Sequence, residues 1–288
     1  MKNALRDAGP ELTEALGLTR MMEDTSGIDT AAFPAIARAA ERGSPEALAM
    51  LGRCFERGVL VKRDAVRAAV EYIRAIRMDS PRGSALLLHL VQQAGFLHEL
   101  KLRADNGEAE AEYAWAGIAA LGFDIPLTKG QAMLTGDQAL HFLRMAAAQH
   151  FPQALVELGL SSYAGRWVQR DVGQAEAYWR EAASLGSREA SIRLAIMGVR
   201  EGRLAGMEDP IALLRTAARE GSVLAEVALA YCYETGQGVA TDASTAARLY
   251  ATAAQRGSQD AYRALRRMLD AIRPPDPEFK FNDLSLGG

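Results

Sequence analysis

The sequence predicts an all-α protein, a right-handed α/α superhelical solenoid of about six helix-pair repeats. Three observations predict this fold class. A pattern of small and aromatic residues recurs along most of the 288 residues, at intervals close to 36. Within each interval, apolar residues follow helical spacing. Glycine and other turn residues stand at the ends of the expected helices.

Each unit carries a small anchor residue near the start of its first helix. The last four anchors lie 36, 35 and 36 residues apart, and an earlier gap of 64 divides into 36 and 28 when Gly83 is an anchor. We therefore predict one shortened unit, at 80–106, and a following 43-residue unit with a long loop at about 123–136. The anchors are Ala47, Gly83, Ala111, Ala154, Ala190, Ala225 and, in a closing helix, Ala261.

This register divides the chain into three parts. Residues 1–30 form an N-terminal segment, helical or partly disordered, and residues 31–271 form the solenoid. Within it, 31–42 supply an entering helix and 258–271 a closing one. Residues 272–288 form an extended tail that follows a proline pair. The tail is disordered, packs on the chain's own surface or on another copy, or is a motif for a separate partner.

Close helix packing is expected within each unit. Small residues such as Gly52 and Gly159 let the second helix approach, and an aromatic residue such as Trp179 fills the space opposite. Glycine follows most second helices, at the position where a positive φ ends a helix at lowest cost. We expect Asp79 and His150 to adopt this conformation in two units that lack the glycine.

Motifs for chemistry are absent from the sequence. The net charge of −3 lacks the basic excess typical of nucleic-acid binding, and no apolar run could span a bilayer. The N-terminus lacks signal-peptide features, so we expect a cytoplasmic protein. No histidine spacing, nucleophile motif or phosphate-binding loop predicts a catalytic residue, a metal site or a cofactor.

Two pairs of residues that are typical of functional sites have structural interpretations here. Cys54 and Cys232 occupy the same place in their repeats and are predicted to be buried thiols that do not form a disulfide. Asp171 and Asp242 precede second helices and are predicted to be their N-caps.

The recurring pattern resembles the Sel1-like repeat, a relative of the tetratricopeptide repeat. Residues 225–257 carry it most fully, with Gly236-Gln237-Gly238-Val239 and Asp242, and residues 154–186 come next. The resemblance covers roughly residues 32–271. Departures are the shortened unit, the inserted loop and a missing Asp–Ala signature around residues 207–210. The resemblance implies a scaffold or adaptor whose concave face grips a partner.

In the related tetratricopeptide repeat the first helix of each pair lines the inner groove. The corresponding positions here are apolar in the middle of the array and charged toward its ends, which suits an amphipathic helix or an extended apolar peptide. A register shifted by one residue would instead place these side chains in the core. The predicted partner-binding residues are Tyr113, Val156, Leu160, Tyr163, Ile192, Ile196, Val199, Val227 and Tyr231, with Arg53, Arg57, Glu234, Arg263 and Arg267 toward the ends.

The sequence therefore predicts a non-enzymatic adaptor or scaffold that binds another protein or peptide, with no nucleic acid, no membrane insertion and no cofactor. Three alternatives stay open. The chain is a neutralising (immunity-type) or chaperone-like partner of an effector protein, a homo-oligomeric scaffold, or an enzyme with a site near the 123–136 loop.

Overall fold

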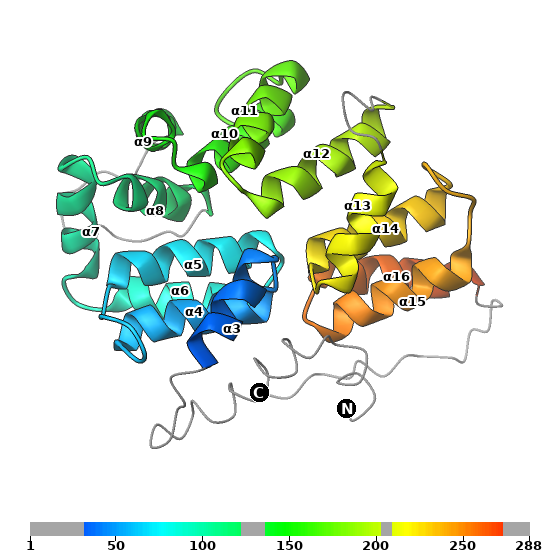
Figure 1. Cartoon of the computed structure of the whole chain (residues 1–288), viewed down its shortest axis with the longest axis horizontal. Helices are drawn as coiled ribbons and strands as arrows, with labels where there is room; N and C mark the ends of the chain where they lie inside the picture. The colour runs from blue at the N-terminus through cyan, green and yellow to red at the C-terminus, as the bar shows by residue number, and fades with distance from the viewer. Residues whose placement is uncertain (1–31, 122–135, 203–208, 273–288) are drawn as a thin grey trace.

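A computed structural model of the chain describes residues 32–121, 136–202 and 209–272, and every regular element in these ranges is an α-helix. Six consecutive helix pairs lie between two single helices, α3 (Ala32–Glu41) and α16 (Gln259–Ile272) (Figure 1). The predicted pairs, entering helix and closing helix are confirmed. The N-terminal segment, the long loop up to residue 135 and the C-terminal tail lie outside the described residues.

The pairs follow one another along the chain as the anchors predict. They are α4 (Pro45–Arg57) with α5 (Ala65–Arg77), α6 (Pro81–Gln92) with α7 (Phe96–Asp105), α8 (Ala109–Ala120) with α9 (Gly136–Ala148), α10 (Pro152–Ala164) with α11 (Val172–Ser184), α12 (Arg188–Glu201) with α13 (Pro210–Arg219), and α14 (Val223–Thr235) with α15 (Ala243–Gln255). No helix within the described ranges is both long enough and apolar enough to cross a membrane.

The anchors have a second role at the starts of helices. Three residues before an anchor, a serine hydroxyl accepts a hydrogen bond from the anchor's backbone N–H, at 3.0–3.3 Å. This satisfies one of the amides that a helix N-terminus leaves without a partner. The serines are Ser44, Ser80, Ser187, Ser222 and Ser258.

Aspartates start four of the six second helices in the described ranges, α5, α11, α13 and α15. Asp171 accepts a hydrogen bond from the Gln174 N–H at 2.9 Å, and Asp242 from the Thr245 N–H at 3.0 Å, so both predicted N-caps are confirmed. Asp209 caps α13 in the same way. From its sequence, this unit is expected to lack the Asp–Ala signature. Asp209 supplies the aspartate of that signature, so only its alanine is missing.

The turns that end second helices have the expected backbone. Asp79 has φ +65° and His150 has φ +57°, so both adopt the left-handed conformation predicted for them. The glycines at the corresponding places have φ between +80° and +96°: Gly43, Gly107, Gly186, Gly221 and Gly257.

The matching of large to small side chains is also confirmed. A Cβ added to Gly159 would overlap the indole of Trp179, and one added to Gly52 would overlap the ring of Tyr72. The indole Nε1 of Trp179 donates to the Val156 carbonyl at 3.1 Å, which holds the ring across α10. Close packing of this kind leaves no room for a side chain at either glycine.

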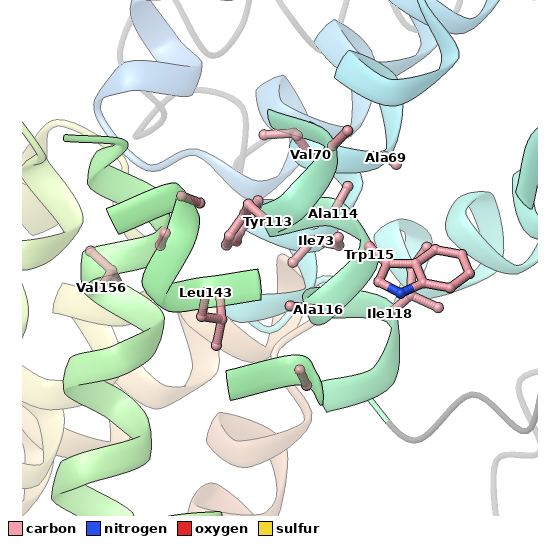
Figure 2. Packing of buried hydrophobic residues seen from close by; sticks show 14 of the residues in the cluster. Ala69, Val70, Ile73, Tyr113, Ala114, Trp115, Ala116, Ile118, Leu143 and Val156 are labelled. Carbon is pink, nitrogen blue, oxygen red and sulfur yellow. The ribbon is translucent and has the colours of Figure 1, made fainter. Parts of the chain in front are cut away.

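Helix α8 lies at the centre of the largest core. Eight consecutive residues, 111–118, are buried, which is typical of a helix enclosed on all sides. Figure 2 shows its side chains near Ile73 of α5 and Leu143 of α9, and Val156 of α10 belongs to the same cluster. The shortened unit explains this position. Only residues 93–95 join α6 to α7, α7 turns away from α6, and α8 packs directly on α5 (Figure 1).

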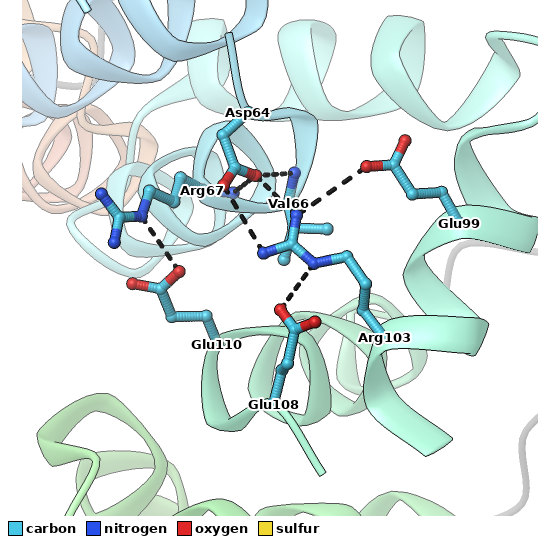
Figure 3. A network of polar contacts seen from close by, with 7 residues as sticks. All are labelled: Asp64, Val66, Arg67, Glu99, Arg103, Glu108 and Glu110. Atoms are coloured by element: carbon cyan, nitrogen blue, oxygen red, sulfur yellow. Dashed lines mark hydrogen bonds and ion pairs between the residues drawn. The ribbon is translucent and has the colours of Figure 1, made fainter. Parts of the chain in front are cut away.

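A polar network secures α7 beside α5 (Figure 3). Asp64, the N-cap of α5, accepts hydrogen bonds from the backbone and, at 2.9 Å, from Arg103 of α7. Arg103 also donates to Glu108 at 2.7 Å, at the start of α8. Although burial opposes it, these hydrogen bonds hold the pKa of Asp64 below its ordinary value.

The two ends of the array meet, which the repeat pattern did not predict. The first pair lies beside α13–α16 in Figure 1. Arg256 pairs with Glu46 at 3.2 Å, although 210 residues separate them in sequence. Ser258 donates to the Asp79 carboxylate. The described helices therefore form a closed array, not an open one.

Candidate protein-binding site

The structure sorts the predicted groove residues by exposure. Tyr113, Val156 and Ile192 are 1%, 2% and 0% exposed, so these three side chains lie in the core. Tyr113 packs against Phe151 with ring centroids 5.5 Å apart, and burial raises the pKa of its hydroxyl. Arg57, Arg263 and Arg267 are exposed, and the remaining eight are half-buried.

Six half-buried apolar residues form the centre of the candidate site. They lie on α10, α12 and α14, the first helices of three consecutive pairs, and we call them the α10–α12–α14 strip. Five of them pack on a core cluster with part of the side chain and leave the rest accessible, and the sixth, Tyr231, lies under the guanidinium of Arg200. The strip consists of Leu160, Tyr163, Ile196, Val199, Val227 and Tyr231.

Charged residues bridge the helices of the strip. The hydroxyl of Tyr163 donates to Glu201 at the end of α12, at 3.1 Å. Arg200, also on α12, lies over the ring of Tyr231 on α14, 5.3 Å from its centroid. These contacts connect each first helix to the next near its C-terminal end, which keeps the strip's aromatic rings in fixed positions.

Two of the charged residues predicted at the C-terminal end, Glu234 and Arg267, form a pair near Tyr231 of the strip. Glu234 of α14 accepts a hydrogen bond from the Tyr250 hydroxyl at 2.9 Å and pairs with Arg267 of α16 at 2.6 Å. Burial and the bond to Glu234 together raise the pKa of Tyr250 above its ordinary range. Arg263 pairs with Asp260 on its own helix at 3.5 Å and is exposed.

The first pair shows the same arrangement at its own helix end. Glu56 accepts hydrogen bonds from the Tyr72 hydroxyl and from Gln93, each at 2.6 Å. Burial lowers the pKa of Arg53, and the neighbouring charge of Arg57 adds to the effect. The predicted charged end is thus an ordered polar surface, separate from the strip.

Sequence reasoning missed a buried ion cluster between pairs. Glu157 of α10 is fully buried and contacts both Arg77 of α5 and Arg166 after α10. Burial opposes the change, but Glu157 raises the pKa of Arg77 above its ordinary value. Burial raises the pKa of Glu71, which pairs with Arg74 at 2.7 Å. No repeat signature marks this cluster, because its members come from different units.

Groups suited to chemistry are sparse in the part of the chain that the structure describes. Cys54 and Cys232 are free and buried, as predicted, and burial raises the pKa of the Cys54 thiol to about 11. Within the described ranges, no three His, Cys, Asp or Glu side chains gather where they could hold a metal ion.

The sequence model of the Sel1 repeat matches this chain at residues 45–78, 136–151, 152–187 and 223–258. These segments coincide with α4–α5, α9, α10–α11 and α14–α15. The chain carries Sel1 repeats. The shortened unit and the α12–α13 pair lie between the matched Sel1 segments, where the sequence departs most from the repeat pattern. Sel1 repeat proteins are generally protein-interaction scaffolds and are typically not enzymes.

Curated relatives and solved structures match this chain over different shares of their own length. This chain is 30% identical to DAP3-binding cell death enhancer 1 of Mus musculus and 28% identical to that of Rattus norvegicus. Each match extends over 179 residues and covers 59% of this chain. The chain spans 33% of the length of these relatives. A Sel1 repeat protein from Oxalobacter formigenes has a TM-score of 0.46 at 19% identity, over 93% of this chain and 99% of its own. A protective antigen of uropathogenic Escherichia coli with an SLR fold has a TM-score of 0.39 at 21% identity. That match covers 85% of this chain and 52% of the antigen.

Proposed function

We propose that this chain is a protein-binding scaffold and that a peptide segment of its partner lies along the α10–α12–α14 strip. The observation that carries the proposal is the strip itself, six half-buried apolar and aromatic side chains on three consecutive first helices. Aromatic side chains that are partly accessible and held in place are typical of binding hot spots. The curated relatives are named for binding a protein, DAP3, which agrees with a binding role for the Sel1 repeats.

The partner segment is of mixed character. The strip offers apolar contact along its length, and Glu201, Glu234 and Arg267 stand beside it. An amphipathic helix or an extended peptide with apolar residues on one side and charges at its edge matches this surface. A neutralising or chaperone-like role would use the same contacts.

Site-specific photo-crosslinking tests the location. A photoreactive phenylalanine analogue replaces Tyr163 or Tyr231 in the native cell, and replaces Leu102 of α7 as a control, since Leu102 is 55% exposed. We expect the same partner to crosslink from both strip positions and not from Leu102. Crosslinking from Leu102 alone would contradict the strip as the site. Crosslinking only to further copies of the chain would favour the homo-oligomeric scaffold instead.

A charge substitution tests the energetics once that partner is purified. Leu160→Glu places a carboxylate in the strip and should weaken binding at least about tenfold, which corresponds to about 1.4 kcal/mol. Leu102→Glu is the matched control and should leave binding unchanged. Circular dichroism and a melting curve verify that both variants are folded. Equal affinity of the folded Leu160→Glu variant would rule out the strip.

A further inference from the structure

Four turns between successive pairs meet where the array closes. They are the turns before α4, α6, α14 and α16, and we call their contact the seam. A Cβ added to Gly43, before α4, would lie 3.4 Å from the Ser222 hydroxyl oxygen, before α14. A Cβ added to Gly257, before α16, would lie 3.2 Å from Pro81, at the start of α6. Both ends of the array therefore touch at two separate places.

One arginine joins three of these turns. Arg256 donates to Glu46 of α4 at 3.2 and 3.3 Å, to Glu226 of α14 at 3.0 Å and to the Gly221 carbonyl at 2.6 Å. Its side chain is only 13% exposed. Of its partners, Glu226 and Gly221 belong to the adjacent turn at the same end of the array, whereas Glu46 belongs to the opposite end. Arg256 thus links its own end of the array to the other.

The fourth turn contributes through Asp79. Its carboxylate accepts hydrogen bonds from the Ser258 hydroxyl and, at 3.3 Å, from the Asp260 N–H, both at the start of α16. Ser258 also caps α16, since it accepts from the Ala261 N–H at 3.0 Å. The same left-handed turn that ends α5 therefore holds the last helix of the array.

The seam differs in character from the joins between neighbouring pairs. Neighbouring pairs share buried apolar clusters; α12, for example, contributes Met197 to one cluster and Ile192 to the next. Across the seam, the apolar contacts among the described residues include Leu224 against the N-terminal cluster and Pro81 against Gly257, and ion pairs and hydrogen bonds join the same turns. Charged groups regain their hydration when such a contact separates, which offsets part of the free energy lost. Opening an apolar core exposes apolar surface to water and costs far more free energy.

We propose that the seam is a reversible latch, which opens while every helix pair stays folded. Local openings of this kind involve the regions with the fewest buried apolar contacts. The arc from α3 to α11 then swings relative to the arc from α13 to α16, with α12 as the continuous connection. Opening moves Arg74 and Arg77 of α5 away from Glu189 of α12, whose charge favours both guanidinium ions in the closed form, and it exposes the surfaces that meet at the seam. A partner that binds the exposed seam surfaces favours the open form by its difference in affinity for the two forms.

Thiol trapping tests the latch without any partner. Ser222 is fully buried at the seam, whereas Cys232, on the same helix α14, is buried in a core cluster at 2% exposure. With Cys54 replaced by alanine, the variant Ser222→Cys carries these two thiols alone, so one protein reports on the seam and on unfolding of α14. We expect the thiol at position 222 to react with a maleimide at least about tenfold faster than Cys232 in native buffer.

A variant with a weakened seam provides the second arm of the thiol-trapping experiment. Adding Arg256→Ala should raise the trapping rate at position 222 at least about tenfold further and leave that of Cys232 unchanged. If both thiols react at one common rate, or if Arg256→Ala changes nothing, the seam opens only by unfolding and the latch is wrong. Ser258→Cys, at 1% exposure on the other side of the seam, serves as a second probe should Ser222→Cys not fold.

Discussion

Single residues with left-handed backbone mark the junctions of this array. The sequence could predict Asp79 and His150 at such positions, because the signal is local and the repeat supplies the register. It could not predict Leu60 and Trp167, which have φ +65° and +63°. These two follow a glycine by two residues in their loops, at the place that Gly238 holds in the last unit. The loop therefore has the same left-handed backbone at this place whether the residue is glycine, leucine or tryptophan.

His150 tests the cost of this conformation. Its side chain is exposed, so replacement removes little packing, and His150→Gly relieves the contact of Cβ with the backbone. We expect the free energy of unfolding in urea to rise by about 1 kcal/mol. His150→Ala keeps the Cβ and should bring no such gain. An equal gain in both variants would mean that the histidine ring, and not its backbone, is unfavourable.

Gly159 tests the close approach of helices. Gly159→Ala forces Trp179 out of place and should destabilise the protein by about 1–3 kcal/mol. Gly173→Ala is the matched control on α11, where the nearest atom to an added Cβ is an Asp171 oxygen at 3.4 Å. Alanine is the better helix former, so the control should be neutral or stabilising by up to about 1 kcal/mol. Thermal melts of both variants measure this difference in stability. Similar losses of stability in the two variants would contradict the close packing of Gly159 against Trp179.

At the scale of elements, the helices were predictable and their relative placement was only partly so. Periodicity and turn residues locate each helix, because both depend on nearby residues. The serine caps follow a visible signal, a serine three residues before five of the seven anchors, which sequence reasoning did not use. The packing of α8 on α5 depends on the three-residue connection of α6 to α7. The sequence predicted that the loop is short but not where the next helix then packs.

Asp209 tests an element boundary that the sequence pattern obscured. Asp209→Ala removes the acceptor for the Ala212 N–H and should lower the free energy of unfolding by about 1 kcal/mol. Asp105→Ala, which loses only a surface pair with Lys101, should cost less than about 0.5 kcal/mol. Chemical denaturation of the two variants gives the comparison. Equal, small effects would show that α13 does not depend on this cap.

At the scale of the whole molecule, closure is the feature that no repeat pattern encodes. A solenoid sequence specifies contacts between neighbours, whereas Arg256 and Glu46 are 210 residues apart. The helices packed around each position also decide which predicted groove residues stay accessible. Tyr113, Val156 and Ile192 were predicted on the same face as Leu160, yet they are buried in core clusters.

The seam has a pH dependence of its own through Glu226. Burial raises the pKa of this carboxyl to about 6 although Arg256 opposes the change. A pKa above the ordinary 4.5 means that the folded protein binds the proton more tightly than the unfolded chain. The stability that Glu226 contributes is therefore fully present below about pH 4.5 and is lost as the pH rises through about 6.

Glu226→Gln should remove this dependence. Between pH 4.5 and 7, the free energy of unfolding of the variant should rise relative to that of the unsubstituted chain by about 1–2 kcal/mol. Glu110→Gln, whose carboxylate pairs with Arg67 at the surface, controls for the general effect of pH. A difference that stays constant across this range would show that Glu226 is not buried as described.

The closed array itself is tested most directly by a distance between its ends. Spin labels go on the exposed residues Arg82 and Gln259, which flank the contact between Asp79 and Ser258, with Cys54 and Cys232 replaced by alanine. A closed array predicts that pulsed electron paramagnetic resonance gives one dominant, narrow distribution at short distance. An open array of stacked helices, about 8–10 Å apart, would instead separate the labels by on the order of 50 Å. A dominant distribution at that distance would contradict closure.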